Sequence, residues 1–170
     1  SEINGYERDD GLKKTVPARL VEEALKYEEN PLGVPDGDLS LAGLADLYLH
    51  YAGLPQESKA PYFWVWVCMN ELQRQDPELS FECLRLCIEG LNTPIQAAFV
   101  AAGPLEDLIV YRGRQVIALI EEEAAASARF RYVLSGVWSQ GIDETEIWQR
   151  VLRARQVGPH MDENGELPAD

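Results

Sequence analysis

The adjacent carboxylates Glu106 and Asp107 are the side chains of this chain that most resemble a catalytic acid–base pair. A hydrolase could use such groups as general acid and general base. Neighbouring side chains on a helix point about 100° apart, however, which does not bring two carboxylates onto one substrate. A structural role is favoured, in which one carboxylate stabilises its own helix N-terminus and the other reaches Arg129, Arg131 or the indole N–H of Trp138. A hydrolase that uses Glu106 or Asp107 is kept as a third hypothesis.

The other groups that could react with a substrate or bind a metal are few. His50 lies late in an expected helix and His160 lies close to the end of the chain, so a Cys–His nucleophile is disfavoured. Cys83 and Cys87 are four residues apart and share one helix face, which indicates core thiols rather than the paired ligand spacings of a zinc site. The consecutive carboxylates at 121–123 point away from one another on a helix and cannot converge on one ion. We therefore predict a non-catalytic protein with no metal site and no cofactor.

The charge balance is strongly acidic and indicates the kind of partner. The chain has 15 Lys and Arg against 29 Asp and Glu, a formal net charge of −14 and a pI near 4.5. Such a surface repels phosphate backbones and anionic lipid headgroups. We expect no nucleic acid and no membrane partner, but a basic protein whose approach the charge would accelerate. The oligomeric state is left open.

Exposed aromatic side chains are the main indication of a binding surface. Trp64 and Trp66 both belong to the apolar run 62–69, and two residues at this spacing cannot face the same neighbour from a helix. If one of them lies at the surface, a tryptophan beside acidic residues there has the composition of a protein-binding hot spot. The alternative, that both are core residues, stays open. The predicted partner-binding residues are Trp64, Trp66, Asp36, Asp38 and Asp46.

Apolar residues recur with a helical period along most of the chain. Asp76-Pro77 and Thr93-Pro94 are typical helix starts, and Asp143 with Glu146 predicts a capped final helix. The run 62–69 is rich in residues that favour strands, but we predict a buried helix because no partner strand is evident. The pattern predicts an all-α fold: an irregular helical array or short α-solenoid of eight or nine helices.

Residues 15–156 are expected to form a single domain of ordinary size. The stretches 1–14 and 157–170 are expected to be flexible. The sequence Gly158-Pro159-His160-Met161 matches the short remnant that a protease site and cloning leave in a recombinant protein. The polar start of the chain is unlike a signal peptide, and no apolar run is long enough to span a bilayer. Together with an odd number of cysteines in helical patterns, these features predict a cytoplasmic protein.

Two short motifs stand out in the second half of the chain. Gly103-Pro104-Leu105-Glu106-Asp107-Leu108 predicts a tight corner between two helices, with Gly103 as a stop and Pro104 as a start. Gly136-Val137-Trp138 closes an amphipathic helix that could pack back on this corner. Over residues 77–138, this arrangement resembles a family of uncharacterised bacterial domains with a G-P-L-E-D-L corner and a closing G-V-W helix. The resemblance implies an all-helical fold and a bacterial origin, and it assigns no catalytic residue.

These observations lead to one favoured function and two alternatives. The favoured hypothesis is an acidic protein-binding domain, most specifically an immunity protein or antitoxin that occludes the active site of a toxin. The alternative is a phage-type inhibitor that acts as an acidic decoy for a nucleic-acid-binding protein. The third hypothesis is the hydrolase introduced above.

Overall fold

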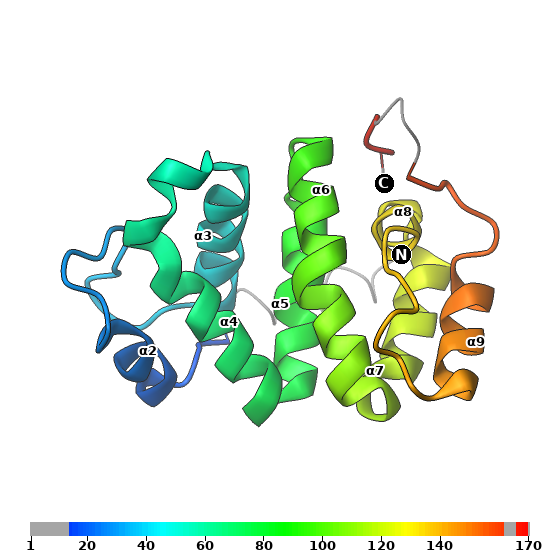
Figure 1. Ribbon diagram of the computed structural model, residues 1–170, viewed down its shortest axis with the longest axis horizontal. Helices are drawn as coiled ribbons and strands as arrows, with labels where there is room; N and C mark the ends of the chain where they lie inside the picture. The colour runs from blue at the N-terminus through cyan, green and yellow to red at the C-terminus, as the bar shows by residue number, and fades with distance from the viewer. Residues whose placement is uncertain (1–13, 162–165, 170) are drawn as a thin grey trace. The chain divides into compact units, whose positions relative to one another are not determined.

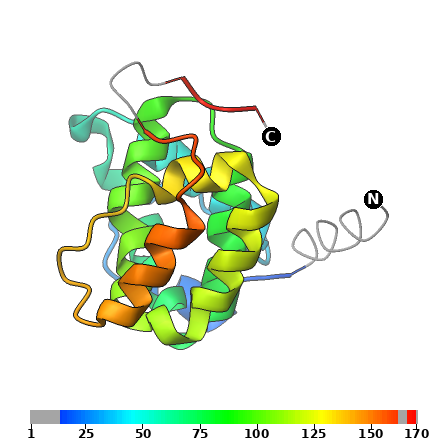
Figure 2. The same cartoon turned by 90° about the vertical axis from the view of Figure 1, so that its right-hand side faces the viewer.

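The computed structural model describes residues 14–161 and 166–169 (Figures 1 and 2). These residues form helices joined by turns, with one isolated β-bridge between Thr15 and Ser40 and no strand, which confirms the predicted all-α class. Contacts between Cα atoms divide the chain into two units, Ser1–Gly90 and Leu91–Asp170. The single domain predicted for 15–156 stays a prediction. The expected flexibility of 1–13, 162–165 and 170 concerns residues outside the described ranges.

Four α-helices build the described part of the first unit. α4 packs against α2, α3 and α5, and α3 also packs against α5 (Figure 1). Two 3-10 turns, Gln56–Ser58 and Ala60–Tyr62, connect α3 to α4. The helices are α2 (Ala18–Leu25), α3 (Leu41–Gly53), α4 (Phe63–Gln75) and α5 (Pro77–Glu89).

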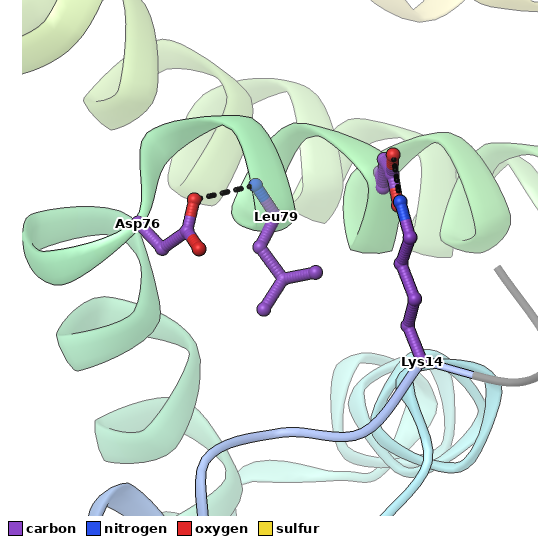
Figure 3. Close-up of polar contacts among 4 residues, drawn as sticks. Lys14, Asp76 and Leu79 are labelled. Carbon is purple, nitrogen blue, oxygen red and sulfur yellow. Dashed lines mark hydrogen bonds and ion pairs between the residues drawn. The ribbon is translucent and has the colours of Figure 1, made fainter.

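Side-chain caps begin two of these helices, and the one at Asp76 is where the sequence predicts it. The Ser40 hydroxyl accepts a hydrogen bond from the Gly43 N–H at 2.9 Å at the start of α3. Asp76 accepts one from the Leu79 N–H at 3.1 Å at the start of α5, as Figure 3 shows. Such caps satisfy backbone donors that have no partner within the helix. Figure 3 also shows the Lys14 ammonium, which donates to the Glu82 carboxylate of α5 at 2.8 Å.

The core of the first unit confirms that the run 62–69 is helical. Trp64, Val65 and Cys68 have no exposed surface and lie on the inner face of α4. Cys83 and Cys87 are equally buried, and their thiols lie 3.8 Å from the carbonyl oxygens of α3 residues 41 and 45. These thiols belong to the core, as predicted.

The second unit contains α6 (Pro94–Val100), a π-helical turn (Ala101–Leu105), α7 (Glu106–Ala126), α8 (Ala128–Leu134) and α9 (Thr145–Ala154). α7 packs lengthwise against α9, as Figure 2 shows from the side of α9. Thr93 and Gln96 form a capping box at the start of α6. At α9 the prediction is wrong: the N-cap is Glu144 rather than Asp143, and no side chain caps the helix.

The predicted corner at Gly103-Pro104 is also wrong, because the chain stays helical from α6 through the π-helical turn into α7 (Figure 1). Proline in an α-helix lacks the N–H for the i→i−4 hydrogen bond and clashes with that carbonyl. A π-helical turn uses i→i+5 bonds and is wider, so Pro104 fits inside it. Glu106 and Asp107 consequently do not lie at a free helix N-terminus, and the helix-dipole role predicted for them does not apply.

Residues 157–161 have contacts that the sequence analysis did not anticipate. The Arg131 guanidinium donates to the carbonyl oxygen of Gly158 at 2.6 Å. The Met161 N–H donates to the Ser135 hydroxyl at 2.8 Å. The segment expected to be flexible is therefore tied to α8 and the turn that follows it over these five positions.

Candidate protein-binding surface

An aromatic pair on α4, Phe63 and Trp66, is the most distinctive exposed feature of the first unit. The two rings stack nearly parallel, with 5.1 Å between their centroids and 16° between their planes. Phe63 is 45% exposed and Trp66 is 36% exposed. Residues three apart share a helix face, so this spacing places both rings on the outer side of α4.

Trp64 does not belong to this surface, although it was predicted to bind a partner. It is fully buried, and its indole N–H donates to the carbonyl oxygen of Leu32 at 2.9 Å. Trp64 is two positions away from Trp66 on the helix, which turns it towards the core. Trp66 is the exposed one of the two tryptophans, so the alternative that both are core residues does not hold.

A cleft of about 420 Å³ adjoins the aromatic pair at Phe63. Its polar lining includes Glu28, Tyr51 and Lys59. The Lys59 ammonium donates to the carbonyl oxygens of Tyr51 and Ala52 at the end of α3, and it lies 4.5 Å from the centre of the Tyr51 ring. Burial lowers the pKa of Lys59 and raises the pKa of Tyr51. Lys59 is thus committed to the C-terminal end of α3, where a cation is stabilised by the helix dipole.

The three predicted aspartates are exposed, but they lie on other segments of the unit. Asp36 and Asp38 are in the loop before α3, and Asp46 is on the outer side of α3. They contribute to a broad charge excess: residues 14–90 carry thirteen Asp and Glu against six Lys and Arg, a net charge of −7. Residues 91–161 carry eight Asp and Glu against seven Arg, a net charge of −1. Over the full sequence the first unit, 1–90, carries −9 and the second, 91–170, carries −5, so the first unit holds the larger share of the acidic excess.

The two motifs of the second unit contact each other. Glu106 accepts a hydrogen bond from the backbone N–H of Trp138 at 2.9 Å, not from the indole or the arginines considered above. A Cβ atom built at Gly136 would lie 2.9 Å from the Cβ atom of Ala101 in the π-helical turn, so only glycine allows this close approach. The predicted packing of the closing segment on the first motif is present.

The side chain of Trp138 is 70% exposed, so its indole does not need the buried acceptor that we had expected. It borders a shallow hollow that Ala102, Glu106 and Gln140 also line. Asp107 is half-buried. Its burial is the main cause that raises the pKa of its carboxyl, and the negative charge of the nearby Glu106 is the second. The contacts between the segment 136–138 and residues 101–106 thus hold two parts of the second unit together.

A second cleft, of about 390 Å³, lies in the second unit between α7 and the start of α9. Arg114 and Glu144, which both line it, form an ion pair in which the Arg114 Nε–H is shared between the two carboxylate oxygens, each at 2.8 Å. Arg112, another lining residue, has non-helical backbone angles that kink α7. The lining combines arginines with carboxylates, and the charges largely offset one another.

The described residues contain few groups with the reactivity of a nucleophile or a metal ligand. Burial raises the pKa of the Cys68 thiol to about 12, which keeps it protonated at neutral pH. Within 14–161 and 166–169, no group of three or more His, Cys, Asp or Glu could hold a metal ion. No helix in these ranges is both long and apolar enough to cross a membrane.

Sequence reasoning missed Phe63, Glu28 and Lys59. The spacing of Phe63 and Trp66 could have identified the pair, because 64, 65, 68, 69 and 72 define the opposite, buried face of the same helix. The cleft could not be found in this way. Its lining comes from the loop after α2, from α3, from the 3-10 turns and from α4, which only the fold brings together.

Together, fold and surface define an all-helical domain with an acidic first unit that carries an exposed aromatic pair. Residues 52–158 match a family described as a family of unknown function (DUF6869), and the chain belongs to this family. The matched range includes the aromatic pair of α4 and both motifs of the second unit. No curated protein and no solved structure matches the chain.

Proposed function

We propose that this chain is a non-catalytic protein-binding domain whose first unit contacts a basic protein through Phe63 and Trp66. The observation that carries this proposal is the exposed, nearly parallel aromatic pair within residues 14–90, a range with a net charge of −7. Tryptophan and other aromatic residues are enriched at binding hot spots, since they bury a large area with little loss of side-chain entropy. The surrounding carboxylates would steer a basic partner towards them.

The most specific form of the proposal is a bacterial, cytoplasmic immunity protein or antitoxin. In that role the acidic first unit would cover a basic active-site cleft of a toxin and exclude its substrate. The G-P-L-E-D-L and G-V-W motifs would then be scaffold features of a bacterial family rather than contact residues. The arrangement of the helices as a short α-solenoid, with eight or nine of them, remains a prediction from the sequence period.

Affinity capture from the native host tests the proposal with two matched tryptophan variants. The baits are the unaltered chain, Trp66→Ala and Trp138→Ala, the last being an exposed tryptophan of the second unit. We expect a basic protein that the unaltered chain and Trp138→Ala retain, and that elutes as salt is raised. Truncation of a hot-spot tryptophan costs about 2 kcal/mol or more, so Trp66→Ala should weaken binding about thirtyfold. Equal retention of the protein by all three baits would refute the proposed surface.

The captured protein then decides between the favoured function and its alternatives. An antitoxin should suppress the toxicity or enzymatic activity of that protein when the two are expressed together. If double-stranded DNA displaces the chain from it, the partner is a nucleic-acid-binding protein and the acidic-decoy alternative holds. A hydrolytic activity of the chain itself that is lost in Glu106→Gln, with unchanged stability, would support the third hypothesis.

A further inference from the structure

We propose that an arginine side chain of the basic partner anchors on the surface formed by Trp66, Phe63 and the carboxylate of Glu28. This inference rests on the proposed function and adds the chemistry of the anchoring residue. It starts from Phe63, which belongs both to the exposed aromatic pair and to the lining of the 420 Å³ cleft. The ring pair and Glu28 are therefore parts of one continuous surface of the first unit.

The aromatic part of this surface favours a planar cation. Phe63 and Trp66 lie within 16° of parallel, and both retain a substantial exposed fraction. A guanidinium group stacks on an aromatic face, is weakly hydrated and loses little solvation there, whereas a lysine ammonium is compact and strongly hydrated. Tryptophan provides the strongest cation–π attraction of the aromatic residues. The surface should distinguish arginine from lysine at equal charge.

The polar part of the surface supplies the complementary anion. Glu28 is the one carboxylate among the described lining residues of this cleft. A carboxylate can accept two parallel hydrogen bonds from a guanidinium, and a lysine cannot reproduce that geometry. Lys59 also lines the cleft, but its ammonium is held by two carbonyl oxygens at the end of α3 and by the Tyr51 ring. The Lys59 ammonium is thus held on the α3 side of the cleft by acceptors of the first unit.

The charge of the first unit supports a cationic occupant. Residues 14–90 carry a net −7, and the exposed carboxylate of Glu57 in the 3-10 turn Gln56–Ser58 is one of the charges that make up this total. Complementary charge increases the association rate, whereas close contacts set the dissociation rate. The proposed arginine would use both effects.

Two acetylated and amidated peptides of equal charge test the inference directly: Gly-Arg-Gly-Arg-Gly and Gly-Lys-Gly-Lys-Gly. Each is titrated into the full chain at fixed ionic strength while the indole N–H resonances are followed by NMR. We expect the arginine peptide to shift the Trp66 resonance and to bind about two- to fivefold more tightly than the lysine peptide. Trp66→Ala and Glu28→Gln should each remove most of that preference, and Trp138→Ala should keep it.

The outcomes separate this inference from the proposed function. Equal affinities for the two peptides, or a preference that survives in Trp66→Ala, would overturn the arginine anchor even if the captured partner depends on Trp66. A clear arginine preference with no captured partner would leave the anchor intact and remove the proposed function. Thermal unfolding checks that Trp66→Ala is folded. Phe63→Leu, which removes the stacked ring but keeps an apolar side chain, gives a second variant that should lose the preference.

Discussion

Arg155 caps the end of α8, and its substitution is the most direct test of the structure of the second unit. Its Nη1 atom donates to three carbonyl oxygens at and after the end of α8, and its guanidinium lies 5.0 Å from the centre of the Trp148 ring. The three acceptors are Leu134 at 3.1 Å, Ser135 at 3.2 Å and Val137 at 2.8 Å. The last carbonyls of a helix have no intrahelical partner, so Arg155 provides their cap. Arg155→Met removes this donor while keeping an unbranched apolar side chain.

The expected loss of stability follows from the number of hydrogen bonds that one nitrogen can make. Nη1 carries two N–H groups, so the three carbonyls share at most two full bonds. A hydrogen bond to a charged group contributes about 1.5–3 kcal/mol, and a cation–π contact adds about 0.5–1 kcal/mol. Part of this is recovered, because the guanidinium is no longer desolvated and water can reach carbonyls that are only part-buried. We expect Arg155→Met to lower the free energy of unfolding by about 2–4 kcal/mol.

Urea unfolding followed by circular dichroism measures this loss against a matched control. Arg153→Met makes the same substitution at an exposed position on the same helix and should change stability by less than about 0.5 kcal/mol. Arg155→Lys keeps a cation but loses the planar donor, and it should fall between the two variants. If Arg155→Met and Arg153→Met unfold at the same urea concentration, the capping role of Arg155 is refuted.

Three further substitutions test separate details of the structure. Gly136→Ala places a Cβ atom 2.9 Å from the Cβ atom of Ala101 and should cost about 1–3 kcal/mol in urea unfolding, whereas Gly37→Ala, with open space around it, should be neutral; equal effects would contradict the close packing. Burial raises the pKa of Asp107 above its usual 3.8, so the folded state disfavours the ionised carboxylate and the free energy of unfolding rises as the pH falls through the folded pKa. Asp107→Asn should therefore have a larger free energy of unfolding than the unaltered chain at pH 7, and this difference should shrink as the pH is lowered towards 3.8. A difference that stays constant from pH 7 to 3.8 would show that the titration of Asp107 does not cause it. Gln73 has a buried side-chain oxygen without a hydrogen-bond partner. Gln73→Met should therefore increase the free energy of unfolding by about 1 kcal/mol and raise the melting temperature. A lower melting temperature would show that the amide is satisfied.

Local signals in the sequence predicted much of the secondary structure. Asp76-Pro77 and Thr93-Pro94 begin α5 and α6, because a capping side chain and a proline in the first turn act on their own few residues. The helical assignment of 62–69 was correct for a less local reason, the lack of a partner strand. Composition alone would have favoured a strand there.

The errors concern residues whose partners are distant in sequence. Pro104 indicates a helix start in isolation, but the chain continues through it because a π-helical turn accommodates the ring. Asp143 and Glu146 form a plausible cap, yet α9 begins at Thr145 with Glu144 as its N-cap, and the Glu144 carboxylate binds Arg114, which lies 30 residues earlier. Such competition between a local cap and a distant ion pair is decided by tertiary structure, which a linear pattern does not contain.

The net charge of −14 has a different meaning once the partners of each charge are known. In the second unit, Arg129, Arg131 and Arg155 donate to backbone carbonyl oxygens, while Arg114 and Arg150 pair with Glu144 and Glu121. These arginines stabilise helix ends and pair with carboxylates of the same unit, so residues 91–161 are nearly neutral. In residues 14–90 the acidic residues outnumber the basic ones by seven, and Lys59 faces the end of α3. The larger share of the charge excess therefore belongs to the unit with the aromatic pair, −9 of the −14, and the acidic residues of 91–170 beyond position 161 account for most of the remainder.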